Sequence, residues 1–247
     1  MENAQLVSLS RQIALQRQMD VVANNMANIN TTGFKAEDIL FEQYQMPGAA
    51  DNDFAGKQSV DYTQDWATVH DLTVGPLQQT GNPLDVALSG GGFLTVQTPA
   101  GNRYTKAGSL AINAQGVLVD LSGNPVLSDA GTPITFDDTD TNITILKNGT
   151  VSTSQGTKGR LAVVEFPNTQ ALTREGNNLW NGPNARPATN TDVLQGTIER
   201  SNVSGVTEMA NMIRVQRAYE QLADLMQKQD DLRSNAVQKL GSVSTTA

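Results

Sequence analysis

Apolar residues near the start of the chain recur at helical spacing. Leu6, Leu9 and Ile13 lie three and four positions apart, and a second series begins two residues later. The members of that second series, again spaced by four and three, are Leu15, Met19, Val22, Met26 and Ile29. This spacing predicts an amphipathic helix whose apolar face resembles the seam of a coiled coil.

A second amphipathic helix is predicted at the other end of the chain. Its apolar positions are Met209, Ile213, Val215, Tyr219, Leu222, Leu225, Met226 and Leu232. Four of them, at 215, 219, 222 and 226, share one face. The pattern leaves two possibilities open: an ordinary antiparallel pair packed on its own domain, or a pair whose seam contacts other copies of the chain.

The middle of the chain has the shorter period of β-strands. Residues 84–98 alternate between apolar and polar positions, break at three consecutive glycines, and then alternate again. Further short runs rich in Val, Ile, Thr and Phe lie within 102–127, 132–136, 142–153 and 159–166. Such runs, separated by turn residues, are typical of hairpins in an antiparallel sheet or barrel.

Helix-breaking residues mark the same division. All nine prolines lie between Pro47 and Pro187, and 18 of the 21 glycines lie between Gly48 and Gly196. We therefore expect an α+β protein in which paired long N- and C-terminal helices, coiled-coil-like, flank a central antiparallel β-rich domain. The expected domains are a terminal helical domain at 1–36 and 199–247, an irregular connecting segment at 37–80, and a β-rich domain at 81–198.

The composition of the chain excludes several classes of function. The 247 residues include 17 Lys and Arg against 25 Asp and Glu, a net charge of −8, which argues against a nucleic-acid surface. The chain has no cysteine, so it has neither disulfides nor thiolate metal sites. No run of about 18 apolar residues is present, so we expect no membrane insertion. The N-terminus lacks the pattern of a secretory signal, so we expect any export to occur without a cleaved signal peptide.

The sequence contains no convincing motif for catalysis or for binding a phosphate or a metal ion. The loop "SGGGF" at 89–93 lacks the Lys-Ser/Thr ending and following helix of a P-loop, and a glycine-permitted bend is the better interpretation. Asp138, Asp140 and Asn142 alternate as in a calcium loop, but the glycine and glutamate that such a loop needs are missing, which favours an acidic turn. His70 is the only histidine, so the usual zinc sites are excluded. We predict no catalytic residue, no metal site and no cofactor.

The two ends carry a more specific signal. "ANNMANINTTGFK" at 23–35 resembles the N-terminal signature of the bacterial flagellar rod and hook proteins, and "NVSGVTEMANMIRVQRAYE" at 202–220 is similar to their C-terminal signature. The stretch at 80–120 is similar to the β region of the rod members. The family-motif residues are Asn24, Asn25, Asn28, Asn30, Thr31, Thr32, Gly33, Phe34, Lys35, Gln216, Arg217, Ala218, Tyr219 and Glu220.

The resemblance implies a structural protein rather than an enzyme. In such proteins the terminal helices pair and face the axis of a tubular assembly, while the β domain points outward. In its length and its N-terminal sequence, the chain resembles the proximal-rod proteins of this family, and the distal-rod proteins are the alternative. The implied partners are other flagellar rod subunits, copies of the same chain and the flagellar export apparatus. The implied location is the rod of the basal body, which spans the periplasm.

The asparagine-rich motif also has a physical interpretation. Asn24, Asn25 and Asn28 can hydrogen-bond to the backbone and to neighbouring side chains, and Gly33 permits a positive φ. We therefore expect a helix stop and a turn, with Phe34 as an anchor. Two other classes of function stay open from the residues alone: a secreted β-rich binding module that dimerises through its helices, and a hydrolase that uses paired carboxylates.

Overall fold

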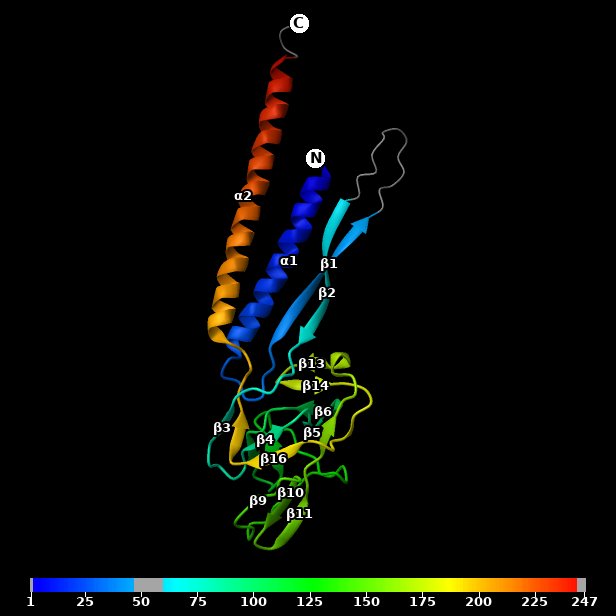
Figure 1. The fold of residues 1–247 in the computed structure, drawn as a ribbon, viewed down its shortest axis with the longest axis vertical. Helices are drawn as coiled ribbons and strands as arrows, with labels where there is room; N and C mark the ends of the chain where they lie inside the picture. The colour runs from blue at the N-terminus through cyan, green and yellow to red at the C-terminus, as the bar shows by residue number, and fades with distance from the viewer. Residues whose placement is uncertain (1, 47–59, 244–247) are drawn as a thin grey trace. The chain divides into compact units, whose positions relative to one another are not determined.

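The fold has a helix near each end and antiparallel β structure between them (Figure 1). A computed structural model describes residues 2–46 and 60–243. Helix α1 spans Glu2–Ala27 and helix α2 spans Gly205–Val243. At about 1.5 Å per residue, these 26 and 39 residues give helices of roughly 39 and 58 Å. The expected α+β class with a helix at each end and a central antiparallel region is confirmed.

Two strands follow α1. They are β1 (Glu37–Met46) and β2 (Val60–His70), which form a two-stranded sheet. This differs from the irregular connection expected at 37–80. The sequence of β2 places Val60, Tyr62, Trp66 and Thr68 at even positions, a period-two pattern that favours a strand.

Fifteen further strands lie in the described part of the chain, between His70 and α2. Those from β3 to β10 are Leu77–Gln79, Val86–Ser89, Phe93–Thr98, Gly101–Thr105, Leu110–Ile112, Leu118–Asp120, Thr144–Ile145 and Thr150–Thr153. Those from β11 to β17 are Gly156–Arg160, Val163–Glu165, Thr173–Glu175, Leu179–Asn181, Arg186–Pro187, Asp192–Gln195 and Thr197–Glu199. A short 3₁₀ helix, η1, spans Thr169–Ala171.

The largest sheet has six strands in the order β13-β14-β6-β5-β12-β15, with antiparallel neighbours throughout. The other sheets of the described residues have two or three strands each. The three glycines expected to form a bend do separate β4 from β5, and Gly90 adopts a φ of +138°. A side chain at Gly92 would lie 2.7 Å from Val163, so the chain is closely packed there.

Two apolar clusters form the core of this region. The larger contains residues with no solvent exposure from several sheets, among them Val86, Leu94, Leu118, Val126 and Val151. The smaller is aromatic and consists of Phe93, Phe166, Leu172 and Trp180. Burial of this kind contributes about 25 cal/mol per Å² of apolar surface, so the β region has the means to fold by its own contacts.

The chain divides into two compact units. The helical unit contains residues 1–26, 37–69 and 205–247, and the β unit contains residues 27–36 and 70–204. These boundaries differ from the expected ones in two ways. Strands β1 and β2 belong with the helices, and the segments next to both helices, 27–36 and 199–204, belong with the β unit because they are hydrogen-bonded into it.

Candidate assembly site

The inner face of the helix pair is covered within one chain. Val22 of α1 is 5% exposed, and Val215 and Leu222 of α2 are 3% and 9% exposed. The amide of Gln12 donates a 2.8 Å hydrogen bond to the hydroxyl of Tyr219, which links the two helices directly. The half-buried members of the same two faces are Leu15, Met19, Met26 and Met226.

The outer face of the pair is apolar and exposed near the start of each helix. On α1, Leu6, Leu9 and Ile13 are 50%, 47% and 60% exposed, and on α2, Met209 and Ile213 are 53% and 52% exposed. We call these five side chains the outer apolar residues. Large side chains of this kind, grouped along a helix, are typical of surfaces that another protein covers.

The seam predicted for α1 is therefore two separate faces. Ile13 and Leu15 are two positions apart, and each position turns the helix by about 100°, so their side chains leave the helix on nearly opposite sides. The offset between the two apolar series marks this change of side. Ile29 is not part of either face, because α1 ends at Ala27 and Ile29 lies in the turn that follows.

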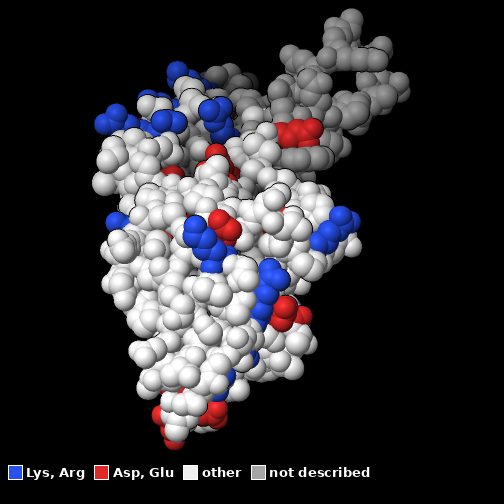
Figure 2. Space-filling model, turned by 60° about the horizontal axis from the view of Figure 1, so that its bottom comes forward, with Lys and Arg blue, Asp and Glu red and all other residues white. Residues whose placement is uncertain are grey.

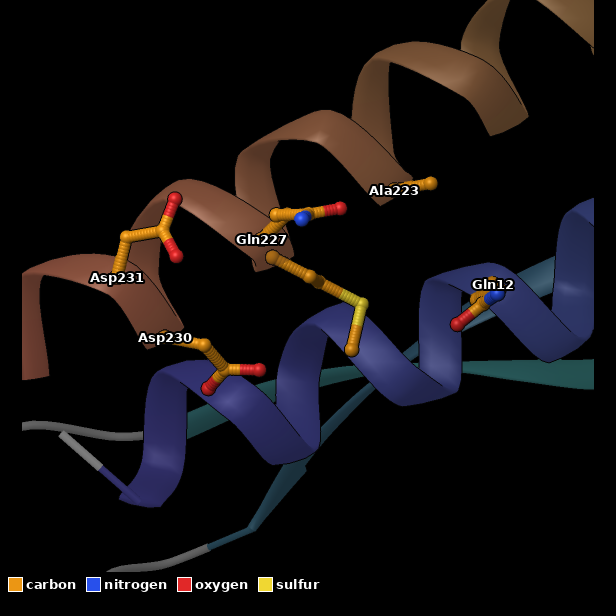
Figure 3. A pocket seen from close by; sticks show the side chains of 6 residues that line it. Gln12, Ala223, Gln227, Asp230 and Asp231 are labelled. Carbon is orange, nitrogen blue, oxygen red and sulfur yellow. The ribbon is translucent and has the colours of Figure 1, made fainter. Parts of the chain in front are cut away.

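A shallow groove lies between the two helices (Figure 3). Its lining residues are Gln12, Ala223, Met226, Gln227, Asp230 and Asp231. The lining mixes amide, carboxylate and small side chains, and it presents no set of groups arranged for catalysis. The groove belongs to the packing of the helix pair.

The first half of the asparagine-rich motif ends α1 and connects it to β1. Asn25 is 2% exposed, and its side chain forms two hydrogen bonds to the backbone of Glu37, donating to the carbonyl at 2.8 Å and accepting from the amide at 3.0 Å. After α1, the Asn28 carbonyl accepts a 3.1 Å bond from the Thr31 amide, and the Thr31 hydroxyl donates to Asn28 Oδ1. The exposed Asn24 precedes this turn.

The second half of the motif is buried in the β unit. The Gly33 amide donates a 2.7 Å hydrogen bond to the Glu199 carbonyl, and Gly33 has a φ of +67°. A Cβ atom there would lie 2.4 Å from the backbone of Lys106, so only glycine fits. The guanidinium carbon of Arg174 lies 4.1 Å from the centre of the Phe34 ring, a cation–π contact.

Lys35 ends the motif in a buried ion pair. Its ammonium contacts Glu199 Oε1, and both side chains have no solvent exposure. The same ammonium donates to the carbonyl of Thr73, and the Gly75 amide donates a 2.9 Å bond to the same carboxylate oxygen. A fully buried ion pair is retained only where hydrogen bonds of this kind complete it.

A second lysine is buried in the same unit and interacts electrostatically with this pair. Lys106 is 2% exposed and donates a 3.0 Å hydrogen bond to the carbonyl of Gly90, with its ammonium 5.0 Å from the centre of the Phe93 ring. Burial lowers the pKa of Lys106 to about 8. The Glu199 carboxylate opposes this fall in pKa, and the positive charge of Lys35 adds to it.

The remaining N-terminal motif residues also contact the β unit. Asn30 Oδ1 accepts a 3.2 Å bond from the guanidinium of Arg200, and the Thr32 carbonyl accepts a 2.9 Å bond from the side chain of Asn178. The motif is therefore more than a helix stop, since most of its length is an attachment to the β unit.

The C-terminal motif lies on α2. Gln216, Arg217 and Glu220 are exposed, and the Gln216 amide donates a 3.1 Å bond to Glu220 Oε1 one turn later. Ala218 and Tyr219 are half-buried on the inner side. The motif thus supplies both the contact to Gln12 and a polar outer surface.

The residues considered for chemistry are used structurally. His70 packs edge-on against Trp180, with ring centres 4.7 Å apart. Asp140 accepts hydrogen bonds from Lys158 and Thr153, with oxygen–nitrogen and oxygen–oxygen distances of 2.6 Å. Across residues 2–46 and 60–243, no three His, Asp or Glu side chains are grouped to hold a metal ion. Within the same ranges, neither helix combines the length and hydropathy of a membrane span.

Charges on the β unit are dispersed. In the lower half of Figure 2, Lys and Arg alternate with Asp and Glu on a surface that is mostly uncharged. Two of the ion pairs on this unit, Arg103 with Glu175 and Lys158 with Asp137, lie at the surface, with nitrogen–oxygen distances of 2.6 and 2.8 Å. No single-sign field is visible there that would attract a nucleic acid.

Sequence reasoning missed the partners of the motif. Lys106, Arg174, Trp180 and Glu199 lie far from residues 31–35 in the sequence, and nothing in their local pattern indicates that they are buried together. Glu199 is the last residue of a short strand, and Lys106 lies in the connection between β6 and β7. Only the unusual concentration of motif residues at 30–35 pointed to a specific local environment.

Family models match three parts of the chain. The model described as "Flagella basal body rod protein" matches residues 6–35, "Flagellar hook protein FlgE/F/G D1 domain" matches 87–153, and "Flagellar basal body rod FlgEFG protein C-terminal" matches 194–239. Together these matches span more than half of the chain and include both terminal motifs. They confirm the resemblance found in the sequence.

Relatives match over nearly the whole length. The chain is 39% identical to the flagellar basal-body rod protein FlgF of Caulobacter vibrioides, covering 99% of this chain and 100% of the relative. It is 33% identical to FlgF of Mesorhizobium japonicum, again over 99% and 100%. Identity to the rod protein FlgG of Buchnera aphidicola is 35%, over 84% of this chain and 88% of the relative.

Each region matched by a family model corresponds to a distinct part of the fold. The N-terminal match covers α1 and the buried motif, the central match covers much of the β unit, and the C-terminal match covers β17 and most of α2. The chain therefore belongs to the flagellar basal-body rod protein family and is a structural subunit of the rod rather than an enzyme.

Proposed function

We propose that this subunit polymerises through its terminal helices, as a proximal-rod member of the family. The helix pair, coiled-coil-like in its packing, faces the axis of the assembly, and the β unit faces outward. The observation that carries this proposal is the exposure of the outer apolar residues, Leu6, Leu9, Ile13, Met209 and Ile213, on helices whose opposite faces are already covered.

The energetic argument is straightforward. Each of these side chains is about half exposed in the single chain, and covering a large aliphatic side chain fully stabilises an assembly by about 1.5 to 3 kcal/mol. Because each side chain is already half covered, about half of that stabilising free energy is still available at each position. A helical assembly repeats this contribution in every copy of the subunit. The outer apolar residues therefore favour contact with neighbouring subunits, either copies of the same chain or other rod proteins.

The proximal-rod assignment rests on the relatives. The relatives named FlgF match over 98–99% of this chain, whereas those named FlgG match over 84–90%. We place the subunit in the part of the rod that crosses the periplasm, and we propose that it reaches this location through the flagellar export apparatus without a cleaved signal peptide. A distal-rod position is the alternative within the family.

Charged substitutions on the two faces of the helices test the proposal. Ile13→Asp and Ile213→Asp each place a charge on the outer face, so the isolated chain should keep its helix content while incorporation into basal bodies and swimming are lost. Circular dichroism of the purified chain, together with basal-body isolation from cells that carry each variant, measures both effects. Normal swimming with Ile13→Asp would contradict assembly through this face.

Two sets of controls separate the faces. Gln16→Asp and Gln221→Asp introduce the same charge at exposed polar positions of the same helices and should leave assembly intact. Val22→Asp and Leu222→Asp place it on the covered inner face, so helix content should fall in the isolated chain before any assembly. In all six variants the β unit should unfold at an unchanged temperature, because none of these positions belongs to it.

A further inference from the structure

The chain crosses between its two units at four points, which follow residues 26, 36, 69 and 204. The β-unit segments at these crossings are hydrogen-bonded to one another. The Ala36 amide donates a 2.8 Å bond to Asn202 Oδ1, and the Ala36 carbonyl accepts a 2.9 Å bond from the Asp71 amide. The Asn202 side chain in turn donates to the Asp71 carbonyl at 2.9 Å. The segment 27–36, which carries two of the crossings, is therefore hydrogen-bonded in one network with the segments that carry the other two.

Glu199 lies at the centre of that network. Its carbonyl accepts from Gly33, its Oε1 pairs with Lys35, and the same oxygen accepts from the amide of Gly75. One residue thus contacts the segment after α1, the segment after β2 and, through its own backbone, the segment before α2. Its second oxygen, Oε2, is buried with no hydrogen-bond partner among the described residues.

The charges around Glu199 do not balance. Lys35 and Lys106 have 0% and 2% exposure, and Glu199 is the one carboxylate buried to the same extent among the described side chains near them. Glu165 also attracts Lys106, but it is only partly buried and already accepts a 2.7 Å bond from Thr191. Two buried ammonium groups therefore depend mainly on one fully buried carboxylate.

We propose that Glu199 is the shared counter-ion of Lys35 and Lys106, and that it acts as a latch holding all four crossings together in the β unit. With the latch closed, the segments that lead into α1 and α2 are fixed to the β unit. Without the carboxylate, two buried positive charges repel each other, and these segments are released. The larger apolar cluster contains none of these residues, so it stays folded.

Amide hydrogen exchange in the full-length Glu199→Gln variant tests the latch. The amides of Gly33, Ala36 and Asp71 should exchange at least ten-fold faster than in the unmodified chain. Those of Leu118 and Val126, which donate to Ile134 and Leu118 inside the core, should exchange at unchanged rates. Unchanged rates at the crossings would overturn the proposal, and so would an equal acceleration at the crossings and in the core.

Two further variants test the sharing of the carboxylate. Adding Lys106→Met to Glu199→Gln removes one of the two unpaired ammonium groups, so exchange at the crossings should slow again. If it does not slow, Lys106 does not depend on Glu199. The control Glu175→Gln removes a carboxylate from the exposed pair with Arg103, which lies in the same unit, and should leave the crossings protected.

Should Glu199→Gln fail to fold, Lys35→Met provides the same test. In that variant Lys106 can still neutralise the charge of Glu199, so amide exchange at the crossings should accelerate less than it does when the carboxylate is lost. Lys35→Met must therefore fold and show an acceleration confined to the crossings. A Lys35→Met chain that also fails to fold would mean that the pair supports the whole unit, and the latch would be rejected.

Discussion

The β unit and the helical unit solve the problem of burial differently. In the β unit, strands from several sheets close around apolar clusters whose members have almost no exposure. In the helical unit, two long helices and a two-stranded sheet bury one face, while Leu6, Ile13, Met209 and Ile213 stay about half exposed. The contrast shows that one chain can contain a unit whose apolar side chains are almost fully buried and a second unit that leaves large apolar side chains exposed; we call the first unit finished and the second unfinished. The unfinished part is the one through which we propose that the subunit assembles.

The polar interactions follow the same contrast. The β unit can retain a buried ion pair and a further buried lysine because a closed core surrounds them. In the helical unit, hydrogen bonds between elements include Gln12 to Tyr219 and Asn25 to Glu37, and Asn25 also bonds the carboxylate of Glu208. That carboxylate is only partly buried, whereas the carboxylate of Glu199 in the β unit has no solvent exposure.

The same substitution in each unit should have very different effects. Leu118→Ala removes a fully buried side chain of the β core and should lower the free energy of unfolding by about 2 to 5 kcal/mol. Leu9→Ala removes a side chain that is 47% exposed and should change it by less than about 0.5 kcal/mol. Urea denaturation followed by tryptophan fluorescence measures both. Equal losses would mean that the outer face of α1 is already covered in the isolated chain.

Sequence analysis identified the elements better than the contacts between them. The helix near each end and the antiparallel β region were predicted because spacings of three and four, or of two, are local properties of the chain. The strand β2 was missed although its period-two pattern is present. The split of α1 into two faces could also have been predicted, because the offset between Ile13 and Leu15 is visible in the sequence.

The surroundings of the motif could not be predicted. Lys35 and Glu199 are separated by 164 residues, and no local pattern distinguishes a buried glutamate from an exposed one. The glycine of the motif suggested a positive φ, and the structure has one, at +67°. That Gly33 must also leave room for the backbone of Lys106 depends on tertiary packing alone.

The buried lysine predicts a pH dependence that belongs to the β unit alone. The pKa of Lys106 is about 8 in the folded chain and about 10.5 when unfolded, so below pH 8 both states are protonated and its burial is a constant penalty. As pH rises from about 8 to 10.5, the folded state releases the proton first and stability increases. The full difference is roughly 3 kcal/mol at 1.36 kcal/mol per pKa unit.

The variant Lys106→Met isolates this effect. It should be more stable than the unmodified chain at pH 7, by up to about 3 kcal/mol, and the advantage should shrink as pH rises through 8 to 10.5. Thermal or urea unfolding of both chains at matched pH values gives the difference. A constant difference across this range would show that Lys106 is not the titrating group.

The last effect is expected from two hydrogen bonds that the helical unit makes within itself. Asn25→Ala leaves the backbone amide and carbonyl of Glu37 without their partner, which should cost about 1 to 3 kcal/mol because these groups face a nearly buried side chain. Asn25 also hydrogen-bonds Glu208, whose pKa is raised by burial and held back by the bonds from Asn25 and Asn211. Its loss should therefore raise the pKa of Glu208 further.

Carbon-detected NMR titration of Glu208 and exchange of the Glu37 amide measure both consequences, with Gln16→Ala on the exposed side of α1 as control. The proposed assembly would cover α1 further, so the loss should weaken the isolated chain more than the assembled rod. An unchanged Glu37 amide would show instead that β1 is held to α1 by its apolar contacts, such as those of the buried Ile39, and not by the asparagine.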